Sequence, residues 1–173
     1  MKRIVTATVI NQSGVLNRIT GLMTKRQFNI ESITVGHTEK EGVSKMTFVV
    51  NVNDNAKIEQ LIKQLNKQID VLKVTDITDQ AIVVRELALI KVISNAQIRS
   101  EISGIIEPFR ASIIDVSRES ITVQVTGNSD KIEAILDLLR PYGIKEMVRT
   151  GITAFPRGSQ KSVTDLKQYS ILN

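Results

Sequence analysis

The feature that most constrains the fold is an order of strands and helices that the chain repeats. In the first half, alternating apolar residues predict four strands, over residues 3–10, 29–36, 43–52 and 71–77. Apolar residues at helical spacing predict two helices, over residues 14–26 and after a cap at 53–55. The resulting order, β-α-β-β-α-β, is typical of a ferredoxin-like sandwich, in which two helices cover one antiparallel sheet.

The same order returns about 80 residues later, which indicates an internal repeat. Four further strands are predicted, over residues 82–93, 111–116, 121–125 and 144–150. Two further helices are predicted, over residues 98–109 and 132–139. The sequence therefore predicts an α+β fold of two ferredoxin-like sandwiches in tandem.

This pattern divides the chain into two domains and a tail. We expect a first domain over residues 1–77, a linker over 78–81 and a second domain over 82–158. Residues 159–173 form a polar tail whose pattern allows a short helix over 163–168. From Pro156 on, the sequence shows no clear partner in a sheet.

The turn Asn11-Gln12-Ser13-Gly14-Val15 joins the first strand to the first helix. With Ser13 as the expected N-cap, the first turn of the helix leaves N–H groups that favour an anion such as an α-carboxylate. We expect Asn29, which begins the second strand, to lie at an adjacent end of the sheet, so that both Asn amides face one pocket. Val15 and Ile30 could hold an aliphatic side chain. The turn is thus a candidate site for a small amino acid; the alternative is that these polar residues only cap a helix and begin a strand.

The two repeats differ at this turn. The counterpart in the second repeat, Ser94-Asn95-Ala96-Gln97, has no glycine. A ligand that approaches backbone N–H groups needs the glycine, because a Cβ atom would block it. We therefore expect the ligand site in the first repeat only.

Composition excludes several classes of function. The chain has no cysteine, which excludes disulfides and thiol chemistry, and its one histidine, His37, lies in a charged loop where a surface position is expected. Phosphate-binding glycine motifs and metal-ligand clusters are absent, so we predict no catalytic residue, no metal ligand and no cofactor on this chain. There is no apolar run of about 18 residues and no secretory signal, so a cytoplasmic location is expected.

Two other functions have some support in the pattern. A glycine turn followed by Arg18 resembles acylphosphatase, in which such a turn cradles a phosphate, but four residues past Gly14 we expect Arg18 on the solvated face of the helix. The net charge of +5 is compatible with RNA binding. However, Phe48 is the one aromatic residue of the two central strands of the first repeat and faces the apolar side, and no basic run exceeds two residues.

Two stretches, Asn11-x-x-Gly14-Val15-Leu16-x-Arg18 and Phe28-Asn29-Ile30-Glu31-Ser32, resemble the regulatory (small) subunit family of acetolactate synthase, also called acetohydroxyacid synthase. The resemblance continues through Glu107-Pro108-Phe109-Arg110 and Arg140-Pro141-Tyr142-Gly143. It covers residues 1–158. It implies an effector-binding ACT domain followed by an ACT-like C-terminal domain.

The resemblance also implies a function without catalysis. Such a chain activates a catalytic (large) subunit that carries thiamine diphosphate, magnesium and FAD, and it confers feedback inhibition by valine in branched-chain amino acid biosynthesis. Valine would bind between the ACT domains of a homodimer. The implied effector-binding residues are Asn11, Gly14, Val15, Asn29, Ile30, Thr34 and Gly36.

The sequence departs from the family pattern away from these residues. Gln12-Ser13 stands where many members have a Lys-Pro type pair, His37 where a proline is usual, and the tail is longer than expected. One alternative within the same fold stays open, namely an ACT-type amino-acid sensor for another enzyme.

Overall fold

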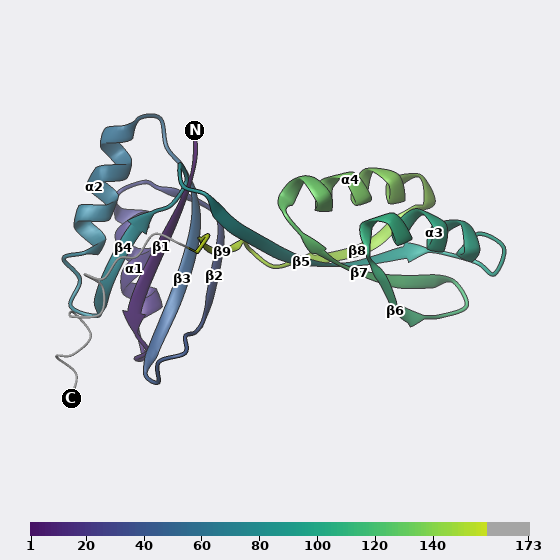
Figure 1. The fold of residues 1–173 in the computed structure, drawn as a ribbon, viewed down its shortest axis with the longest axis horizontal. Coiled ribbons are helices and arrows are strands. Elements are labelled where there is room, and N and C mark those ends of the chain that lie inside the picture. The colour runs from purple at the N-terminus through teal and green to yellow at the C-terminus, as the bar shows by residue number, and fades with distance from the viewer. Residues whose placement is uncertain (159–173) are drawn as a thin grey trace.

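Two antiparallel sheets, each covered on one face by two helices, lie at the two ends of an elongated molecule (Figure 1). The structure is a computed structural model, and it describes residues 1–158. The predicted tail over 159–173, with its short helix over 163–168, lies outside the described residues.

The first unit has the predicted order β-α-β-β-α-β. Its elements are β1 (Lys2–Ile10), α1 (Val15–Lys25), β2 (Asn29–His37), β3 (Val43–Asn51), α2 (Asn55–Leu65) and β4 (Val71–Asp76). The strand order in the sheet is β2-β3-β1-β4, so β1 lies between β3 and β4 and β2 forms an edge. This order confirms the predicted ferredoxin-like sandwich.

The second unit repeats this order and adds a strand. Its elements are β5 (Ile82–Ile93), α3 (Arg99–Ile106), η1 (Glu107–Phe109), β6 (Ser112–Val116), β7 (Ser120–Gly127), α4 (Ser129–Leu139), η2 (Arg140–Tyr142), β8 (Ile144–Arg149) and β9 (Thr153–Pro156). The sheet order is β6-β7-β5-β8, with β9 paired to β5. The tandem α+β architecture is therefore confirmed.

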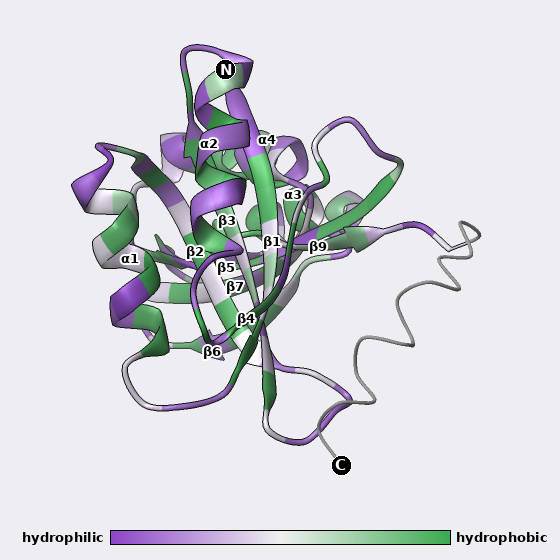
Figure 2. Ribbon diagram, turned by 90° about the vertical axis from the view of Figure 1, so that its left-hand side faces the viewer, coloured by the Kyte–Doolittle hydropathy of each residue, from purple (hydrophilic) through white to green (hydrophobic). Residues whose placement is uncertain are grey.

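The alternating apolar residues of the strands form two cores. In the first unit, Val5, Ala7 and Val9 of β1 are at most 1% exposed and pack against helix residues such as Ile19 and Leu61. The second unit has an equivalent cluster. In Figure 2, α1 carries both hydrophobic and hydrophilic residues, as expected for a helix that packs one face against the core. Each core forms as the period of the apolar residues predicts.

A third cluster joins the two units. After β8 the chain returns to the first unit, and β9 pairs with the start of β5, for example Ala154 with Val84. Ile152 and Ala154 then pack against Val49 and Ile77 on the face of the first sheet that carries no helix. The expectation that the chain lacks a sheet partner from Pro156 on is thus wrong at Pro156. The domain bounds at residues 77 and 82 stay predictions, because β5 contributes to both units.

Within residues 1–158, no helix is both long enough and apolar enough to cross a membrane.

Candidate functional site

The turn between β1 and α1 is built around Gly14. This residue is the N-cap of α1 and has φ +84°, a left-handed conformation that glycine adopts without strain. No side chain caps the helix, so the prediction that Ser13 is the N-cap is wrong. The left-handed glycine lets the helix begin one residue later, which removes the Ser13 hydroxyl from the capping position.

Backbone donors are available at this turn. The N–H of Val15 donates to Gln12 O at 3.3 Å, and the N–H of Arg18 donates to Gly14 O at 2.9 Å. No residue of the described chain accepts a hydrogen bond from the N–H of Leu16 or Asn17. The start of α1 therefore offers free donors at the positive end of the helix dipole, which favours an anion.

Arg18 folds back over this turn. A Cβ atom placed on Gly14 would lie 3.1 Å from Arg18 Nη1, and Arg18 Nη2 donates to the carboxylate of Asp70. Asp70 is fixed beside the turn because its carbonyl accepts from the N–H of Ile10 at 2.8 Å. Arg18 is exposed, as expected for the solvated face of the helix, but its guanidinium group also turns back toward Gly14 and Asp70. Its charge is already paired, so it does not supply the free phosphate-binding cation that the acylphosphatase alternative needs.

Asn11 and Asn29 lie at opposite ends of the first sheet. The N–H of Asn11 donates to Gly42 O just before β3 begins, whereas Asn29 pairs with Asn51 where β3 ends. At about 3.3 Å per residue, the nine residues of β3 separate these ends by about 30 Å. The expectation that the two asparagines share one pocket within a chain is wrong, because β1 and β2 are both antiparallel to β3 and therefore run parallel to each other.

The remaining candidate residues divide between the two faces of the sheet. Val15 is 3% exposed and belongs to the first core, and Ile30 packs against that core. Thr34 and Gly36 instead line a cleft on the opposite face, where Thr34 Oγ1 donates to Ile152 O at 2.6 Å. The seven predicted residues thus occupy three places: the β1–α1 turn, the start of β2 and the cleft.

That cleft, of about 1080 Å³, lies between the two units and was not predicted. The first unit contributes Thr34, Gly36 and Lys45, and the second contributes Arg85, Thr126 and Phe155, among others. No sequence signal marks it, because it arises from the return of β9 to the first unit.

Gly151 is where the chain passes closest to β2. A Cβ atom added there would meet the backbone O, C and N of Ile33 at 3.0, 3.1 and 3.2 Å. These are backbone atoms of a paired strand, so they have little freedom to move.

Replacing Gly151 with alanine is expected to lower the free energy of unfolding by about 1–3 kcal/mol, because the added methyl group forces the segment away from β2. Urea unfolding of the full chain measures this change. Gly104→Ala is the matched control, because a Cβ atom there meets nothing within 4 Å. An equal loss in both variants would contradict the proposed contact.

An ion-pair cluster fixes the second unit next to this contact. Arg149 Nε and Nη2 donate to the two carboxylate oxygens of Glu86 at 2.7 and 2.8 Å, and Nη1 donates to Glu133. Burial alone would raise the pKa of Glu86, but hydrogen bonds from Arg149 and Ser129 hold it below its usual value. The hydrogen bond to Glu86 raises the pKa of Arg149. Arg149 therefore holds Glu86 charged, although the Glu86 side chain is only 4% exposed.

The described residues contain no cluster of side chains that could hold a metal ion. No three His, Asp or Glu side chains among residues 1–158 lie close enough together to hold a metal ion. His37 is exposed at the end of β2, as expected for a surface histidine.

Comparison with known families identifies the chain. A family model described as the small subunit of acetolactate synthase matches residues 85–158, and one described as an AHAS small subunit-like ACT domain matches residues 6–73. These two matches cover most of the chain and coincide with the two repeats.

Individual relatives agree with the family models. The acetolactate synthase small subunit of Bacillus subtilis is 69% identical over 172 residues, which cover 99% of this chain and 100% of the relative. A probable acetolactate synthase small subunit of Archaeoglobus fulgidus is 50% identical over 161 residues, covering 93% and 100%. The crystal structure of the small subunit from Thermotoga maritima matches with a TM-score of 0.84 and 40% identity, covering 91% of this chain and 98% of that one. The resemblance seen in the motifs is confirmed, and the chain belongs to the family of acetolactate synthase small subunits.

Proposed function

We propose that this chain activates the catalytic subunit of acetolactate synthase and makes it sensitive to feedback inhibition by valine. The observation that carries the proposal is the turn at Gly14, whose left-handed backbone leaves free N–H groups at the start of α1 in a member of this family. Those donors suit the carboxylate of an amino acid, and the exposed amide of Asn11 suits its ammonium group. The chain itself supplies no catalytic group and no cofactor under this proposal.

We further propose that the valine site needs two copies of the chain. Within one copy, Gly14 and Asn29 lie at opposite ends of the sheet, so one small ligand cannot touch both. Among residues 1–158, β2 pairs with β3 alone, so its outer edge could pair with a second copy. A two-fold axis at this edge reverses the direction of the second β2 and brings its Asn29 to the end where the first copy has Asn11. Such a homodimer would hold two equivalent sites.

A ligand held by two copies controls activity by stabilising one arrangement of them. Its effect is limited by the difference between its affinities for the two arrangements. A typical coupling of about 1–3 kcal/mol corresponds to roughly 5- to 150-fold inhibition. We propose that the catalytic partner, which would carry thiamine diphosphate, magnesium and FAD, is the protein whose activity this coupling changes, and that both work in the cytoplasm.

The proposal is tested by mixing the purified chain with the acetolactate synthase catalytic subunit of the same organism and measuring acetolactate formation with and without valine. We expect activation by the chain and inhibition by valine only when the chain is present. Bovine serum albumin at equal concentration controls for non-specific stabilisation. Valine binding without any effect on acetolactate formation would instead support an amino-acid sensor for another enzyme, and absence of both would refute the proposal.

A further inference from the structure

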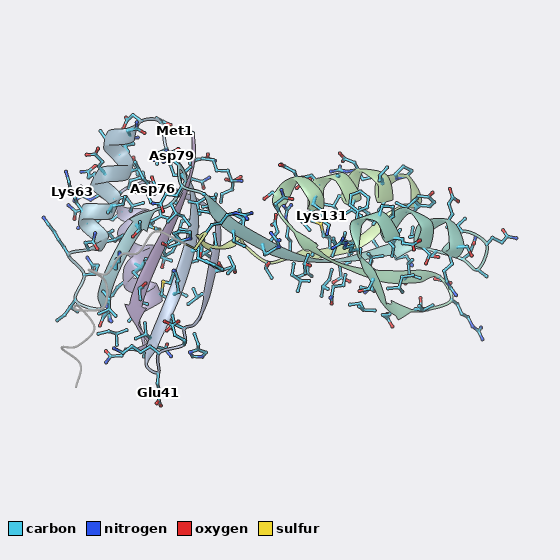
Figure 3. The ribbon with its side chains drawn as sticks, in the orientation of Figure 1. Met1, Glu41, Lys63, Asp76, Asp79 and Lys131 are labelled. Carbon is cyan, nitrogen blue, oxygen red and sulfur yellow. The ribbon has the colours of Figure 1, made fainter. Side chains whose placement is uncertain are left out.

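Three basic side chains converge on a second pocket that the proposed function does not use. Arg85 of β5, Lys131 of α4 and Arg157 after β9 line a pocket of about 410 Å³ beside Gly127 and Asn128. Lys131 lies in the first turn of α4 and is labelled in Figure 3, toward the end of the helix that is nearer the first unit. This volume lies within the range of about 300–1,000 Å³ that is typical of small-molecule sites.

Each of these cations is held by a backbone carbonyl, which orients it without cancelling its charge. Lys131 Nζ donates to Thr126 O at 2.9 Å, Arg85 Nη1 donates to Val84 O at 2.7 Å, and Arg157 Nε donates to Ile82 O at 3.2 Å. Within the part of the chain that the structure describes, the remaining N–H groups of these three side chains bind no other residue, so they are available to a ligand.

No carboxylate among residues 1–158 forms an ion pair with any of the three. The nearest acidic residue in the strand register is Glu86, which pairs with Gly127, but its carboxylate is already bound to Arg149. Asp130 lies in the first turn of α4 but does not line the pocket. The described residues therefore leave the positive charge of the pocket uncompensated.

Gly127 is required for the position of Lys131. The residue is buried, and a Cβ atom on it would lie 2.6 Å from Cδ and 3.1 Å from Cβ of Lys131. The lysine side chain thus crosses the glycine to reach the pocket. Any larger residue at position 127 would displace it.

We propose that this pocket binds a small molecule carrying a diphosphate group. Three cations need a ligand with several negative charges, whereas a single carboxylate would neutralise only one of them. Two of the cations are guanidinium groups, whose parallel N–H groups match the oxygens of a phosphate. A nucleoside diphosphate and free pyrophosphate both present this group.

The exposed ring of Phe155 bears on whether the ligand is a nucleotide or free pyrophosphate. It is 52% exposed and pairs with Val83, so that it shares the outer face of the β5–β9 ribbon with Arg85. Both residues line the adjoining cleft of about 1080 Å³. If the ligand is a nucleotide, its base has an aromatic surface on which to stack.

The test is isothermal titration of the full chain with inorganic pyrophosphate and, separately, with ADP. We expect the triple variant Arg85→Gln, Lys131→Gln, Arg157→Gln to bind pyrophosphate more than tenfold more weakly than the original chain. The matched control removes three exposed charges elsewhere, through Lys57→Gln, Lys67→Gln and Arg118→Gln, and should retain binding. Gly127→Ala removes no charge but should also weaken binding, because it displaces Lys131.

The results distinguish a nucleotide from free diphosphate as the ligand, and some of them would overturn the proposal. Tighter binding of ADP than of pyrophosphate, lost in Phe155→Leu, identifies a nucleotide; equal binding of both identifies free diphosphate. Pyrophosphate binding weaker than about 1 mM in the original chain, or an equal loss in the matched control, overturns the proposal. Loss of catalytic-subunit binding in the triple variant without any pyrophosphate binding would assign the pocket to an acidic segment of a protein and overturn it as well. The thermal unfolding midpoint without ligand, expected to be equal in all variants, excludes misfolding as the cause.

Discussion

Replacing Arg149 with methionine is expected to lower the free energy of unfolding by about 3–5 kcal/mol at pH 7. The side chain of Glu86 is 4% exposed, and both of its carboxylate oxygens accept hydrogen bonds from Arg149. Without the guanidinium, the carboxylate is left charged in a site that water hardly reaches. Urea unfolding followed by circular dichroism measures the loss.

The matched control for this variant is Arg140→Met. Arg140 pairs with Asp137, but both side chains are at least 65% exposed, so we expect a change of no more than about 1 kcal/mol. The double variant Glu86→Leu, Arg149→Met should regain part of the stability, because it removes the unpaired charge. An Arg149→Met loss no larger than that of Arg140→Met would show that the pair does not hold the second unit together.

The pH dependence gives an independent check on the same pair. The pKa of Glu86 in the folded chain lies below its usual value, so its contribution to stability is present above the unfolded pKa and is lost as the pH falls through the folded pKa. In Arg149→Met the pKa of Glu86 rises, and the carboxyl group can bind a proton instead of staying charged. The stability difference between the variant and the original chain should therefore shrink as the pH is lowered from 7 to 4.

Asn11→Ala is expected to raise the valine concentration for half-inhibition of the holoenzyme by roughly 10- to 150-fold, the effect of losing a hydrogen bond of about 1.5–3 kcal/mol to a charged ligand. The side chain of Asn11 is exposed and forms no hydrogen bond with any other described residue, so the fold should not change. Asn55→Ala, at an exposed position on α2, is the matched control. Full valine sensitivity in Asn11→Ala would place the effector elsewhere.

Mixing two variants tests whether the site is shared between copies. If each site takes Asn11 from one copy and Asn29 from the other, then Asn11→Ala and Asn29→Ala chains combine into a dimer with one intact site. Mixed, refolded chains should then recover part of the valine sensitivity that each variant lacks alone. If one copy supplied both residues, every site in the mixture would be damaged and no recovery would occur.

The repeated order of strands and helices could be predicted from the sequence. The spacing of apolar residues and the capping residues each determine secondary structure within a few neighbouring residues. Asp54, for example, accepts from the N–H of Lys57 as the N-cap of α2, within the predicted cap at 53–55. A glycine at position 14 is expected because a ligand would approach its backbone, and that role stays a prediction. The structure gives a different local reason for the glycine, its left-handed φ of +84°. The N-cap itself could not be predicted, because Ser13 and Gly14 compete for it and the left-handed backbone favours the glycine.

Long-range features were harder to predict. The pairing of Arg18 with Asp70 joins residues 52 positions apart, and nothing in the helix pattern around Arg18 indicates it. β9 has only four residues and ends in a proline, so it shows no alternation that would mark it as a strand. The misplacement of Asn29 has a different cause: the predicted topology already makes β1 and β2 parallel, which puts the end of one far from the start of the other.

The length of β5 has a mechanical consequence. Its first residues pair with β9 against the first sheet, and its residues from Glu86 on pair with β7 in the second sheet, so the strand is held at both ends. At about 3.3 Å per residue, its 12 residues span about 40 Å. Over a strand of this length, a tilt of β5 by about 5° at one end displaces its other end by about 3.5 Å, roughly the diameter of an atom. In the proposed homodimer, a rearrangement between the two ACT domains that is too small to change either core would thus move the second unit by a distance that a protein bound to it could detect.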